Sequence, residues 1–361
     1  MKFFQYKLTF HQPLHTAQCS FTEREGLLIN CDYLAFSCYG DVAPLPGYSK
    51  ESLTDVIDQL VKYQNTIDRY FMQDKSYADW KTFADSLDLY PSLRFGLDTF
   101  LFDRLSKKRG IPFNTHISAK KTDTVPVNTV FGLGDLPNII DDCKQSWSEG
   151  YRTFKFKIGW DFEKELKIVE EIRNTLPSAN IRLDANQAWQ VNEAIQNLHK
   201  LSHLNIEYCE QPVESENIKG LAEIKRITNV PIAADEAATN KEAVGKLIDL
   251  DAVDVLVLKP MLIGSLDDIF QIVNEAHEKD IETVFTTSLE SGVGRLATAH
   301  LASIMGSSKY AHGLATGKYF KNDILDDSSC LIHGSYHIPG GRGIGLEPDL
   351  NLLEEIEFGV S

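Results

Sequence analysis

The chain lacks any long apolar run. Its uninterrupted apolar stretches, such as Val255 to Leu258, fall far short of the ~20 residues that a membrane helix needs. Its first residues, MKFFQYKLTFHQPLHT, mix apolar and polar side chains without a small-residue cleavage site, so we expect a strand there rather than a signal peptide. The sequence also has no short internal repeat and no low-complexity segment, which argues against a repeat protein or a fibrous one.

The chain has fewer basic residues than acidic ones. The 36 Lys and Arg residues face 52 Asp and Glu residues, which gives a formal net charge of -16. An acidic surface of this size argues against nucleic acid and against an anionic membrane as partners. A small anionic substrate stays compatible with it, because a local lysine cluster or a metal ion can reverse the field inside a cleft.

Paired cysteines and clustered histidines are also missing. None of the six cysteines forms a CxxC pair, and several lie in apolar stretches, so we expect reduced thiols and a cytoplasmic protein. The ten histidines show no convincing metal-ligand spacing, since His199 and His203 are four residues apart without a third ligand. We interpret His312 as a structural residue at a strand end. The cysteines are Cys19, Cys31, Cys38, Cys143, Cys209 and Cys330.

The overall composition is ordinary for a globular protein, with 43% hydrophobic and 24% charged residues in a chain of 361. That length corresponds to about two domains, or to one large barrel with a smaller domain. The first ~95 residues are expected to form an α+β unit with strands at Lys2 to Phe10 and Gly26 to Cys38. A helix is expected from Ser49 as its N-cap, and Pro91 suits the first turn of another. The first of these helices has one apolar face, made of Leu53, Val56, Ile57, Leu60 and Val61.

From about Val127 the pattern changes to short apolar runs that alternate with amphipathic helical stretches. Eight such runs, with starts about 21 to 31 residues apart, predict βα units and a parallel sheet, and their density favours a closed barrel. The tail from Ile332 returns to irregular texture and is expected to rejoin the N-terminal unit. The runs are Val127–Phe131, Thr153–Ile158, Ile181–Asp184, Ile206–Cys209, Pro231–Ala234, Ala252–Leu258, Thr283–Thr286 and Tyr310–His312. The helix candidates between them include Phe162–Asn174, Glu193–Leu201, Leu221–Ile227, Leu266–His277 and Arg295–Met305.

Acidic residues end three successive runs. In a parallel barrel the active site gathers at the C-terminal ends of the strands, so the residue that ends each run matters most. The third run ends at Asp184, and Glu210 and Asp235 directly follow the fourth and fifth runs. These acids are 26 and 25 residues apart, or about one βα unit each. These carboxylates are therefore expected to converge in space. Oxygen ligands of this kind suit Mg²⁺, and a divalent ion would relieve the repulsion among them.

Basic residues flank that acidic set. Lys155 and Lys157 are two residues apart on the second run and point to the same face. Lys259 ends the sixth run, 24 residues after Asp235, and Arg182 shares the face of the third run's terminal acid. A lysine inside an apolar strand is unusual, since burying an unpaired ammonium group is costly.

Each of these residues also has a simpler interpretation. A single acidic residue after a strand is more often a helix N-cap or a surface residue, although the complete ordered set is hard to explain in that way. The lysine pair could decorate an edge strand. Arg182 could equally form an ion pair in the barrel core.

The ordered set of KxK, Asp, Glu, Asp and Lys resembles the enolase superfamily, specifically its muconate-lactonizing subgroup, over nearly the whole chain. The resemblance implies an α/β fold with a modified (β/α)7β TIM-like barrel over residues 96–325. It also implies an α+β capping domain formed by both termini, residues 1–95 and 326–361. A mandelate-racemase-like assignment is disfavoured, because that subgroup would not place a lysine at the position of Lys259.

Within the subgroup, the sequence is similar to the o-succinylbenzoate synthase family of menaquinone biosynthesis. The similarity lies in Gly40–Leu53 (GDVAPLPGYSKESL), Thr22–Ile29, Thr287–Gly294 and His312–Gly317. The eighth strand end lacks the DxD with which dipeptide epimerases of the subgroup hold an amino group, which argues against a dipeptide substrate. The stretch GLATGK has the wrong spacing for a phosphate-binding loop and is interpreted as a barrel loop.

The resemblance implies a mechanism as well. Asp184, Glu210 and Asp235 would hold Mg²⁺, with Mn²⁺ as a substitute, and the metal would stabilise an enediolate. Lys157 would remove the proton α to the substrate carboxylate and return it to the departing hydroxyl, which is a syn dehydration. Lys259 would stabilise the intermediate from the opposite face.

Further contacts to the small-molecule carboxylate substrate are expected around these residues. Lys155 and Arg182 are expected to face it, and the charge of Lys155 would lower the pKa of Lys157. The capping loop at His15–Gly26 would close the site and exclude water. The contacts to the succinyl end are expected from Ser288, Gly313 and Leu314.

Two other functions fit the same residues. An N-acylamino acid racemase could use the two flanking lysines as opposed bases. A non-catalytic barrel could bind a metal or a small acid, although metal binding alone needs no lysines. The sequence makes no prediction of the oligomeric state.

Overall fold

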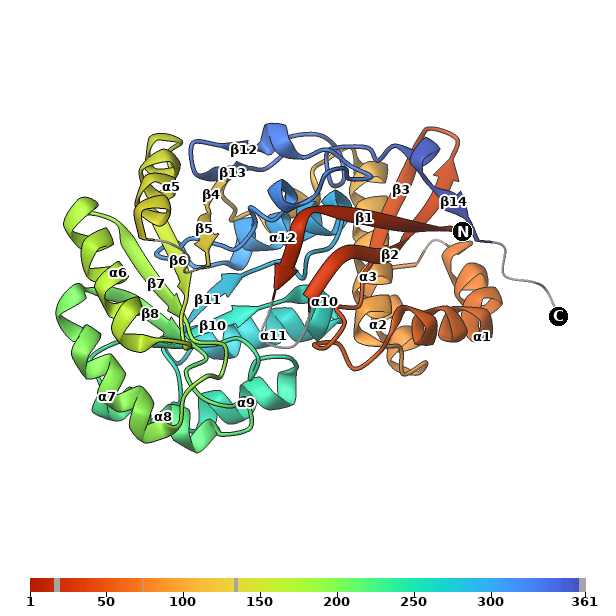
Figure 1. Cartoon of the computed structure of the whole chain (residues 1–361). Helices are drawn as coiled ribbons and strands as arrows, with labels where there is room; N and C mark the ends of the chain where they lie inside the picture. Colours follow the sequence, from red (N-terminus) through yellow and green to blue (C-terminus); the bar gives the residue numbers. More distant parts are fainter. Residues whose placement is uncertain (16–19, 74, 133–135, 357–361) are drawn as a thin grey trace.

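The computed structural model describes residues 1–15, 20–73, 75–132 and 136–356. An antiparallel sheet with a group of helices stands beside a curled parallel sheet that further helices surround (Figure 1). Within these ranges, no helix combines the length and the apolar character that a membrane span requires. The five described cysteines are unpaired thiols, and Cys19 lies outside the described residues.

The antiparallel sheet has the strand order β14-β1-β2-β3. Both ends of the chain contribute to it, because β14 pairs with β1 at Phe4 and Gln5. The N-terminal residues thus form a strand, as expected, and the C-terminal segment lies beside it. The strands are β1 (Lys2–His15), β2 (Ser20–Tyr33), β3 (Phe36–Val42) and β14 (Glu354–Glu355).

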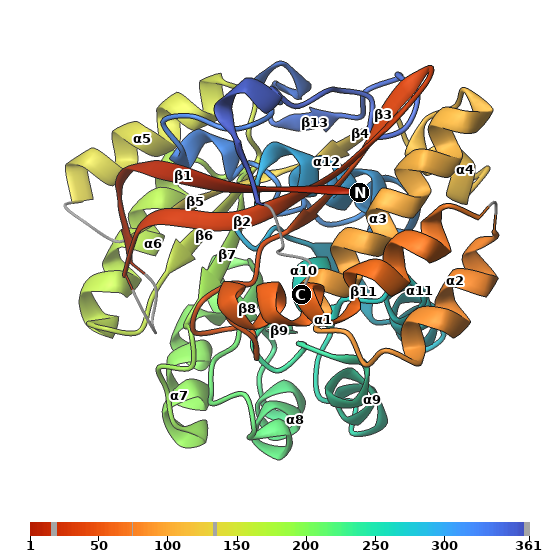
Figure 2. The same cartoon turned by 90° about the vertical axis from the view of Figure 1, so that its right-hand side faces the viewer.

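Helices pack on the face of this sheet that carries Phe3, Leu27 and Ile29 (Figure 2). One of them lies directly on β3, because glycine stands on both sides of the contact: a Cβ atom on Gly40 would come within 2.1 Å of the carbonyl oxygen of Gly96. The helices on this face are α1 (Leu53–Phe71), α2 (Tyr77–Asp85) and α3 (Pro91–Arg109), and α4 (Phe113–Ile117) follows α3 and contacts α12 (Gly292–Met305) of the barrel.

The expected strand at Gly26 to Cys38 is wrong, because the chain turns back within it. β2 and β3 form a hairpin in which Tyr33 lies opposite Phe36. The turn residues between them are Leu34 and Ala35. Because neither is a glycine, asparagine or proline, the sequence gives no signal that the chain reverses direction here.

The first helix starts later than expected. Its N-cap is Ser52 rather than Ser49, because the Ser52 hydroxyl accepts the N–H of Asp55 and the Asp55 carboxylate accepts the N–H of Ser52. Ser49 instead stabilises the preceding turn, where its hydroxyl accepts the N–H of Leu45 at 2.8 Å. The expected helix start at Pro91 is confirmed by α3.

The parallel sheet confirms the α/β fold class with a barrel and an α+β unit beside it. Its strands lie in the order β11-β10-β9-β8-β7-β6-β5, so each neighbours the next along the chain. This is the order that consecutive βα units produce. The strands are β5 (Asn128–Phe131), β6 (Thr153–Lys157), β7 (Asn180–Asp184), β8 (Ile206–Glu210), β9 (Ile232–Ala234), β10 (Val255–Leu258) and β11 (Glu282–Phe285).

The eighth apolar run closes the sheet without forming a regular strand. His312 forms a parallel bridge with Val127 beside β5, and Gly313 forms another with Thr286 beside β11. His312 has the structural role expected of it: its ring is fully buried, and Nδ1 accepts the N–H of Phe285 at 3.0 Å. Burial lowers the pKa of His312 to about 3, so the ring is neutral.

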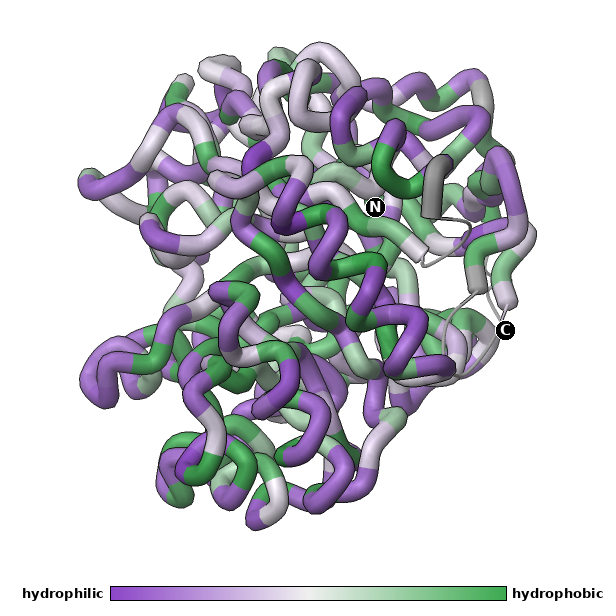
Figure 3. Tube along the Cα trace, turned by 60° about the vertical axis from the view of Figure 1, so that its left-hand side comes forward, coloured by the Kyte–Doolittle hydropathy of each residue, from purple (hydrophilic) through white to green (hydrophobic). Residues whose placement is uncertain are grey.

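Helices surround the barrel, and in Figure 3 hydrophilic segments lie mainly at the periphery while hydrophobic ones run through the interior. The helices are α5 (Leu136–Ser148), α6 (Phe162–Thr175), α7 (Val191–Leu201), α8 (Ile218–Ile227), α9 (Lys241–Asp249), α10 (Pro260–Ile263), α11 (Leu266–His277) and α12 (Gly292–Met305). The five helix candidates named from the sequence correspond to α6, α7, α8, α11 and α12.

The expected boundary between the N-terminal unit and the barrel lies within a packed helix rather than in a linker. The expected division at residues 95 and 96 falls inside α3, which contacts both β3 and α10. A small sheet of β12 (Leu331–Ile332), β13 (Ser335–His337) and β4 (Thr124–Pro126) joins the C-terminal segment to the residues before the barrel. The exact division into two domains stays a prediction.

Candidate active site

Three carboxylates meet at the C-terminal edge of the barrel sheet. Asp184 ends β7 and Glu210 ends β8, and the two residues are register partners on adjacent strands. Asp235 directly follows β9, the next strand in the sheet. All three line one cavity. The structure thus brings together the acids that stand about one βα unit apart in the sequence.

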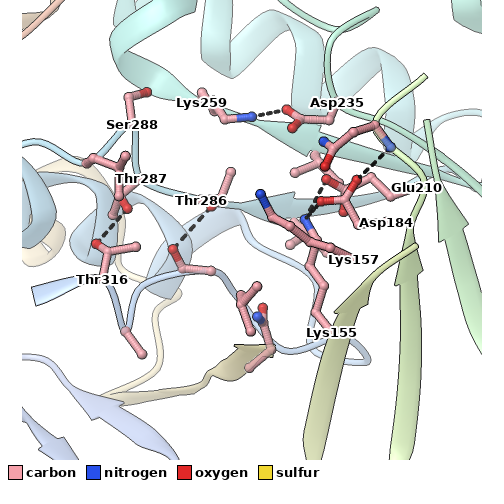
Figure 4. A pocket seen from close by; sticks show the side chains of 18 of the residues that line it. Lys155, Lys157, Asp184, Glu210, Asp235, Lys259, Thr286, Thr287, Ser288 and Thr316 are labelled. Atoms are coloured by element: carbon pink, nitrogen blue, oxygen red, sulfur yellow. Dashed lines mark hydrogen bonds and ion pairs between the residues drawn. The ribbon is translucent and has the colours of Figure 1, made fainter. Parts of the chain in front are cut away.

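Lysines reach this cavity from both sides of the acids. Lys155 on β6 bridges two carboxylates, with its Nζ 2.9 Å from Asp184 and 2.7 Å from Glu210. Lys259, which follows β10, forms an ion pair with Asp235 (Figure 4). Because β6 and β10 flank β7, β8 and β9 in the sheet, the lysines stand on opposite flanks of the acidic set.

Lys157 differs from the other two lysines. It ends β6 and lines the cavity, yet among the described residues no carboxylate or other group pairs with its Nζ. Burial lowers the pKa of Lys157, and the nearby charge of Lys155 adds to this effect against the pull of Asp184. For Lys155 burial is outweighed by Asp184 and Glu210, which raise its pKa well above the ordinary value. Lys157 is therefore the lysine best suited to give up its proton and act as a base.

The acids fit a divalent cation in their chemistry. All are oxygen donors, and Oε2 of Glu210, a residue 1% exposed, has no hydrogen-bond partner within the described ranges. Burial and repulsion from Asp184 and Asp235 raise the pKa of Glu210 to about 8, so the site is short of positive charge.

In this structure, lysine ammonium groups form ion pairs with the three carboxylates. No three His, Cys, Asp or Glu side chains in the described part of the chain form a metal-binding group, and Lys155 and Lys259 contact the carboxylates instead. A divalent ion bound to Asp184, Glu210 and Asp235 would take over the role of these ammonium groups.

The antiparallel sheet β14-β1-β2-β3, the helices α1 to α3 and the segments that join them, which we call the capping unit, supply an apolar wall of the cavity. Leu14 of β1 and Phe21 of β2 line it, and so do Leu45 and Tyr48 from the segment after β3. The expected capping loop, His15–Gly26, is described in part: residues 16–19 lie outside the described residues. An apolar wall of this kind excludes water from the reacting groups.

Hydroxyl groups form another wall. Thr287 and Thr316 share a hydrogen bond of 2.8 Å between their Oγ1 atoms, and Thr286 Oγ1 donates to the carbonyl of Gly313 at 3.2 Å (Figure 4). Ser288 is different, since its buried Oγ has no hydrogen-bond partner in the described part of the structure. It is therefore the hydroxyl with a free donor and acceptor for a ligand.

The two residues expected beside Ser288 lie differently. Gly313 lines the cavity and has no room for a side chain, because a Cβ atom would come within 2.4 Å of Thr286 Oγ1. Leu314 does not line the cavity: its buried side chain faces a neighbouring pocket beside Arg295. Its alternation with Gly313 along the extended segment accounts for this difference.

Arg182 does not reach the cavity either. It is fully buried in the barrel interior, where its Nε donates to Glu207 at 2.5 Å and its Nη1 donates to the carbonyl of Ala311 at 2.7 Å. Its guanidinium also lies over the ring of Tyr208, 4.6 Å from the centroid. These contacts correct the expectation that Arg182 faces the substrate and match the alternative of a core ion pair.

Replacing Arg182 with methionine is expected to lower the free energy of unfolding by about 3–5 kcal/mol, because Glu207 loses its partner while it stays largely buried. Urea unfolding measures this change. The double variant with Glu207→Leu removes both charges and should recover most of the loss. A sharp rise in KM without a loss of stability would instead make Arg182 a substrate contact.

Several polar residues at or beside the site were missed in the sequence, and Glu236 and Asn186 are two of them. Glu236 follows Asp235 directly, and burial together with the charge of Asp235 raises its pKa to about 7. Asn186 lines the cavity and donates from Nδ2 to Glu236 at 3.2 Å. The signals were the adjacent acids in ADEA and the asparagine two residues after Asp184, but neither spacing shows which side chain faces the cavity.

Comparison with known proteins places the chain in a family. Residues 138–352 match the model of the enolase C-terminal domain-like family, and residues 1–103 match the model of the MenC N-terminal domain. The chain belongs to the enolase superfamily, a family of enzymes.

The relatives differ from one another in their activities. An N-succinylamino acid racemase of Thermus thermophilus is 29% identical over 74% of this chain and 71% of its own length. An o-succinylbenzoate synthase of Bacillus subtilis is 23% identical over 97% of this chain and 92% of its own length. A dipeptide epimerase of Cytophaga hutchinsonii, solved with Mg and the dipeptide D-Ala-L-Val, has the same fold, with a TM-score of 0.86 at 21% identity over 98% of both chains.

Proposed function

We propose that this protein catalyses the syn dehydration of 2-succinyl-6-hydroxy-2,4-cyclohexadiene-1-carboxylate to o-succinylbenzoate, a step of menaquinone biosynthesis. One observation carries the proposal: Lys157 and Lys259 line one cavity from opposite flanks of the three carboxylates. A base, a cation and a set of oxygen ligands suit a reaction that begins with loss of a proton α to a carboxylate. The match to the MenC N-terminal domain and the o-succinylbenzoate synthases among the relatives support this choice.

Each residue has a defined task in this reaction. Mg²⁺, or Mn²⁺ in its place, would supply positive charge beside the substrate carboxylate. Lys157 takes the proton from the ring carbon that bears the carboxylate, and the C–H electron pair moves onto the carboxylate to give an enediolate. That pair then returns to form the new ring double bond as the C–O bond of the neighbouring carbon breaks. The Lys157 ammonium returns its proton to the leaving hydroxyl on the same face, so water departs and the ring becomes aromatic. Lys259, whose pKa is raised by Asp235 and Glu236 against burial, keeps its charge near the ring.

The remaining walls suit the rest of this substrate. The apolar side chains of the capping unit can cover the ring, and the hydroxyl of Ser288 can donate a hydrogen bond to the succinyl carboxylate. The N–H of Gly313 donates to the carbonyl of Phe285, so Gly313 shapes the wall rather than binding the carboxylate. Within the described residues, the carboxylates that line the cavity are those of the proposed metal set. A further acid, Glu236, bonds to Asn186 beside this set but does not line the cavity, which favours a small carboxylate substrate without an amino group. We also propose a cytoplasmic location, in line with the free thiols.

A second candidate is racemisation of N-succinylamino acids. Lys157 and Lys259 on opposite flanks could remove and return a proton on either face of a planar intermediate, and racemases of this class stand among the relatives. Both reactions use the same first step, so the same residues serve them.

Parallel assays with the purified chain test the proposal. We expect turnover of the cyclohexadiene substrate with Mg²⁺, and slower or absent racemisation of N-succinylamino acids. Faster racemisation would make the second candidate the main function. Absence of both reactions, with no solvent deuterium entering any acid tested, would leave a non-catalytic binding protein.

A further inference from the structure

A buried carboxylate of the capping unit contacts the barrel beside the cavity. Asp41 lies near the end of β3, is 1% exposed and accepts a hydrogen bond of 2.7 Å from the hydroxyl of Tyr6. Its other oxygen accepts the N–H of Ser291 at 3.0 Å, the hydroxyl of Ser291 at 2.6 Å and the N–H of Gly294 at 3.3 Å. Asp41 and Ser291 are 250 residues apart, so this contact joins the two units.

Through this contact, Asp41 of β3 helps to cap the N-terminus of the barrel helix α12. Ser291 is the N-cap of α12, and its own hydroxyl accepts the N–H of Val293. The next free N–H, that of Gly294, is bound by Asp41 instead. A negative charge at this end of α12 also interacts favourably with the helix dipole. The start of α12 therefore depends on a side chain that the capping unit supplies.

The segment just before α12 forms part of the cavity wall. Ser288 and Leu289 line the cavity, and Leu289 has a left-handed backbone with φ of 61°, which is strained for leucine. Contacts on both sides hold this conformation: Glu290 accepts the N–H of Ser288, and Asp41 holds the N–H of Ser291. Ser288, whose buried Oγ has no hydrogen-bond partner among the described residues, lies in the segment that these contacts hold.

We propose that Asp41 is a positioning residue, through which the capping unit sets the place of Ser288 and Leu289 in the cavity wall and thereby substrate affinity and selectivity. Asp41 touches neither the cavity nor the reacting groups. The claim about affinity rests on the function proposed above, whereas the claim about the wall does not.

Asp103 provides a matched control. It is also fully buried, it accepts the N–H groups of Tyr39 at 3.0 Å and Ile344 at 2.8 Å, and burial raises its pKa to about 6, as it does for Asp41. It also forms a buried ion pair of 3.1 Å with Lys107. Asp103→Ala therefore removes at least as many buried polar contacts as Asp41→Ala, while Asp103 and these partners lie outside residues 287–294.

The main test compares Asp41→Ala with Asp103→Ala by hydrogen exchange and by kinetics. In Asp41→Ala, amide exchange in residues 287–294 should become about tenfold faster or more, because buried N–H groups lose their acceptor. KM should rise about tenfold with a much smaller change in kcat, since the contact acts on binding rather than on the base. Asp103→Ala should lower the unfolding midpoint without either effect.

Two further variants separate positioning from general damage. Asp41→Asn keeps an oxygen for the α12 N–H groups and gives its amide to Tyr6, so it should restore most of the affinity. Gly294→Ala should mimic Asp41→Ala, although alanine normally favours a helix, because its Cβ would lie 2.5 Å from Glu290 Cγ and 2.7 Å from Asp41 Oδ2.

The outcomes are distinct. Unchanged exchange in residues 287–294 of Asp41→Ala overturns the proposal, and so does a KM that stays at the wild-type value despite faster exchange. A wild-type protein without turnover in any assay refutes the proposed function, while the exchange comparison still decides whether Asp41 holds the wall.

Discussion

Replacing Lys157 with alanine is expected to lower kcat of the proposed dehydration by about 10³-fold or more, since a positioned general base contributes ~10²–10⁴ and the same group also returns the proton. The structure makes this lysine special among the three at the site. Lys155 and Lys259 are tied to carboxylates, whereas Nζ of Lys157 has no partner among the described residues and burial lowers its pKa. Steady-state kinetics with the cyclohexadiene substrate measures the loss.

Lys157→Arg is the matched control for charge. A guanidinium keeps the positive charge at this position but does not release its proton in proteins, so this variant should be nearly as inactive as Lys157→Ala. Mg²⁺ affinity, measured by calorimetry, should change little in either variant. More than a tenth of the wild-type kcat in Lys157→Ala would contradict the assignment of the base.

Removal of divalent cations is expected to abolish activity, and added Mg²⁺ should restore it. The structural reason lies in the charges of the site, where repulsion among Asp184, Glu210 and Asp235 adds to burial and raises the pKa of Glu210 to about 8. A divalent ion would relieve that repulsion and so bind the folded state. Mg²⁺ should therefore raise the thermal unfolding midpoint of the chelator-treated protein, a readout that does not depend on turnover.

Glu210→Gln separates metal binding from general stability. The amide removes one negative charge from the acidic set, so the metal-free variant should be at least as stable as the metal-free wild type. The rise of the unfolding midpoint with Mg²⁺ should then disappear, together with activity. Full activity in metal-free protein, or the same Mg²⁺-dependent rise in the variant, would refute a metal at this position. Mn²⁺ in place of Mg²⁺ tests the proposed substitute in the same experiment.

The sequence predicted the barrel and the acidic set for the same physical reason. Strands buried on both faces read as short apolar runs, and their regular spacing indicates βα units. Once a parallel barrel is expected, the C-terminal strand ends must meet, so Asp184, Glu210 and Asp235 were placed together without any knowledge of contacts. The two flanking lysines followed from the same rule, because β6 and β10 enclose the acidic strands.

Other features depended on contacts between distant segments. Arg182 shares the inward face of Asp184, but the position of Glu207 and Ala311 around it decides that it forms a core ion pair. The hairpin at Leu34 and Ala35 carries no turn residue, so only the pairing of β2 with β3 reveals it. Leu314 and Gly313 are neighbours in the chain, yet only one of them faces the cavity.

The sequence by itself determined which charged residues meet at the barrel mouth, because strand periodicity decides the face of each side chain and the ends of parallel strands converge in any such barrel. The tertiary structure alone decided how those residues are held and what surrounds them. Leu14, Phe21 and Leu45 reach the cavity, and Asp41 reaches α12, only because the capping unit docks on the barrel mouth. Such contacts join residues far apart in the chain, and no local pattern of side chains encodes them.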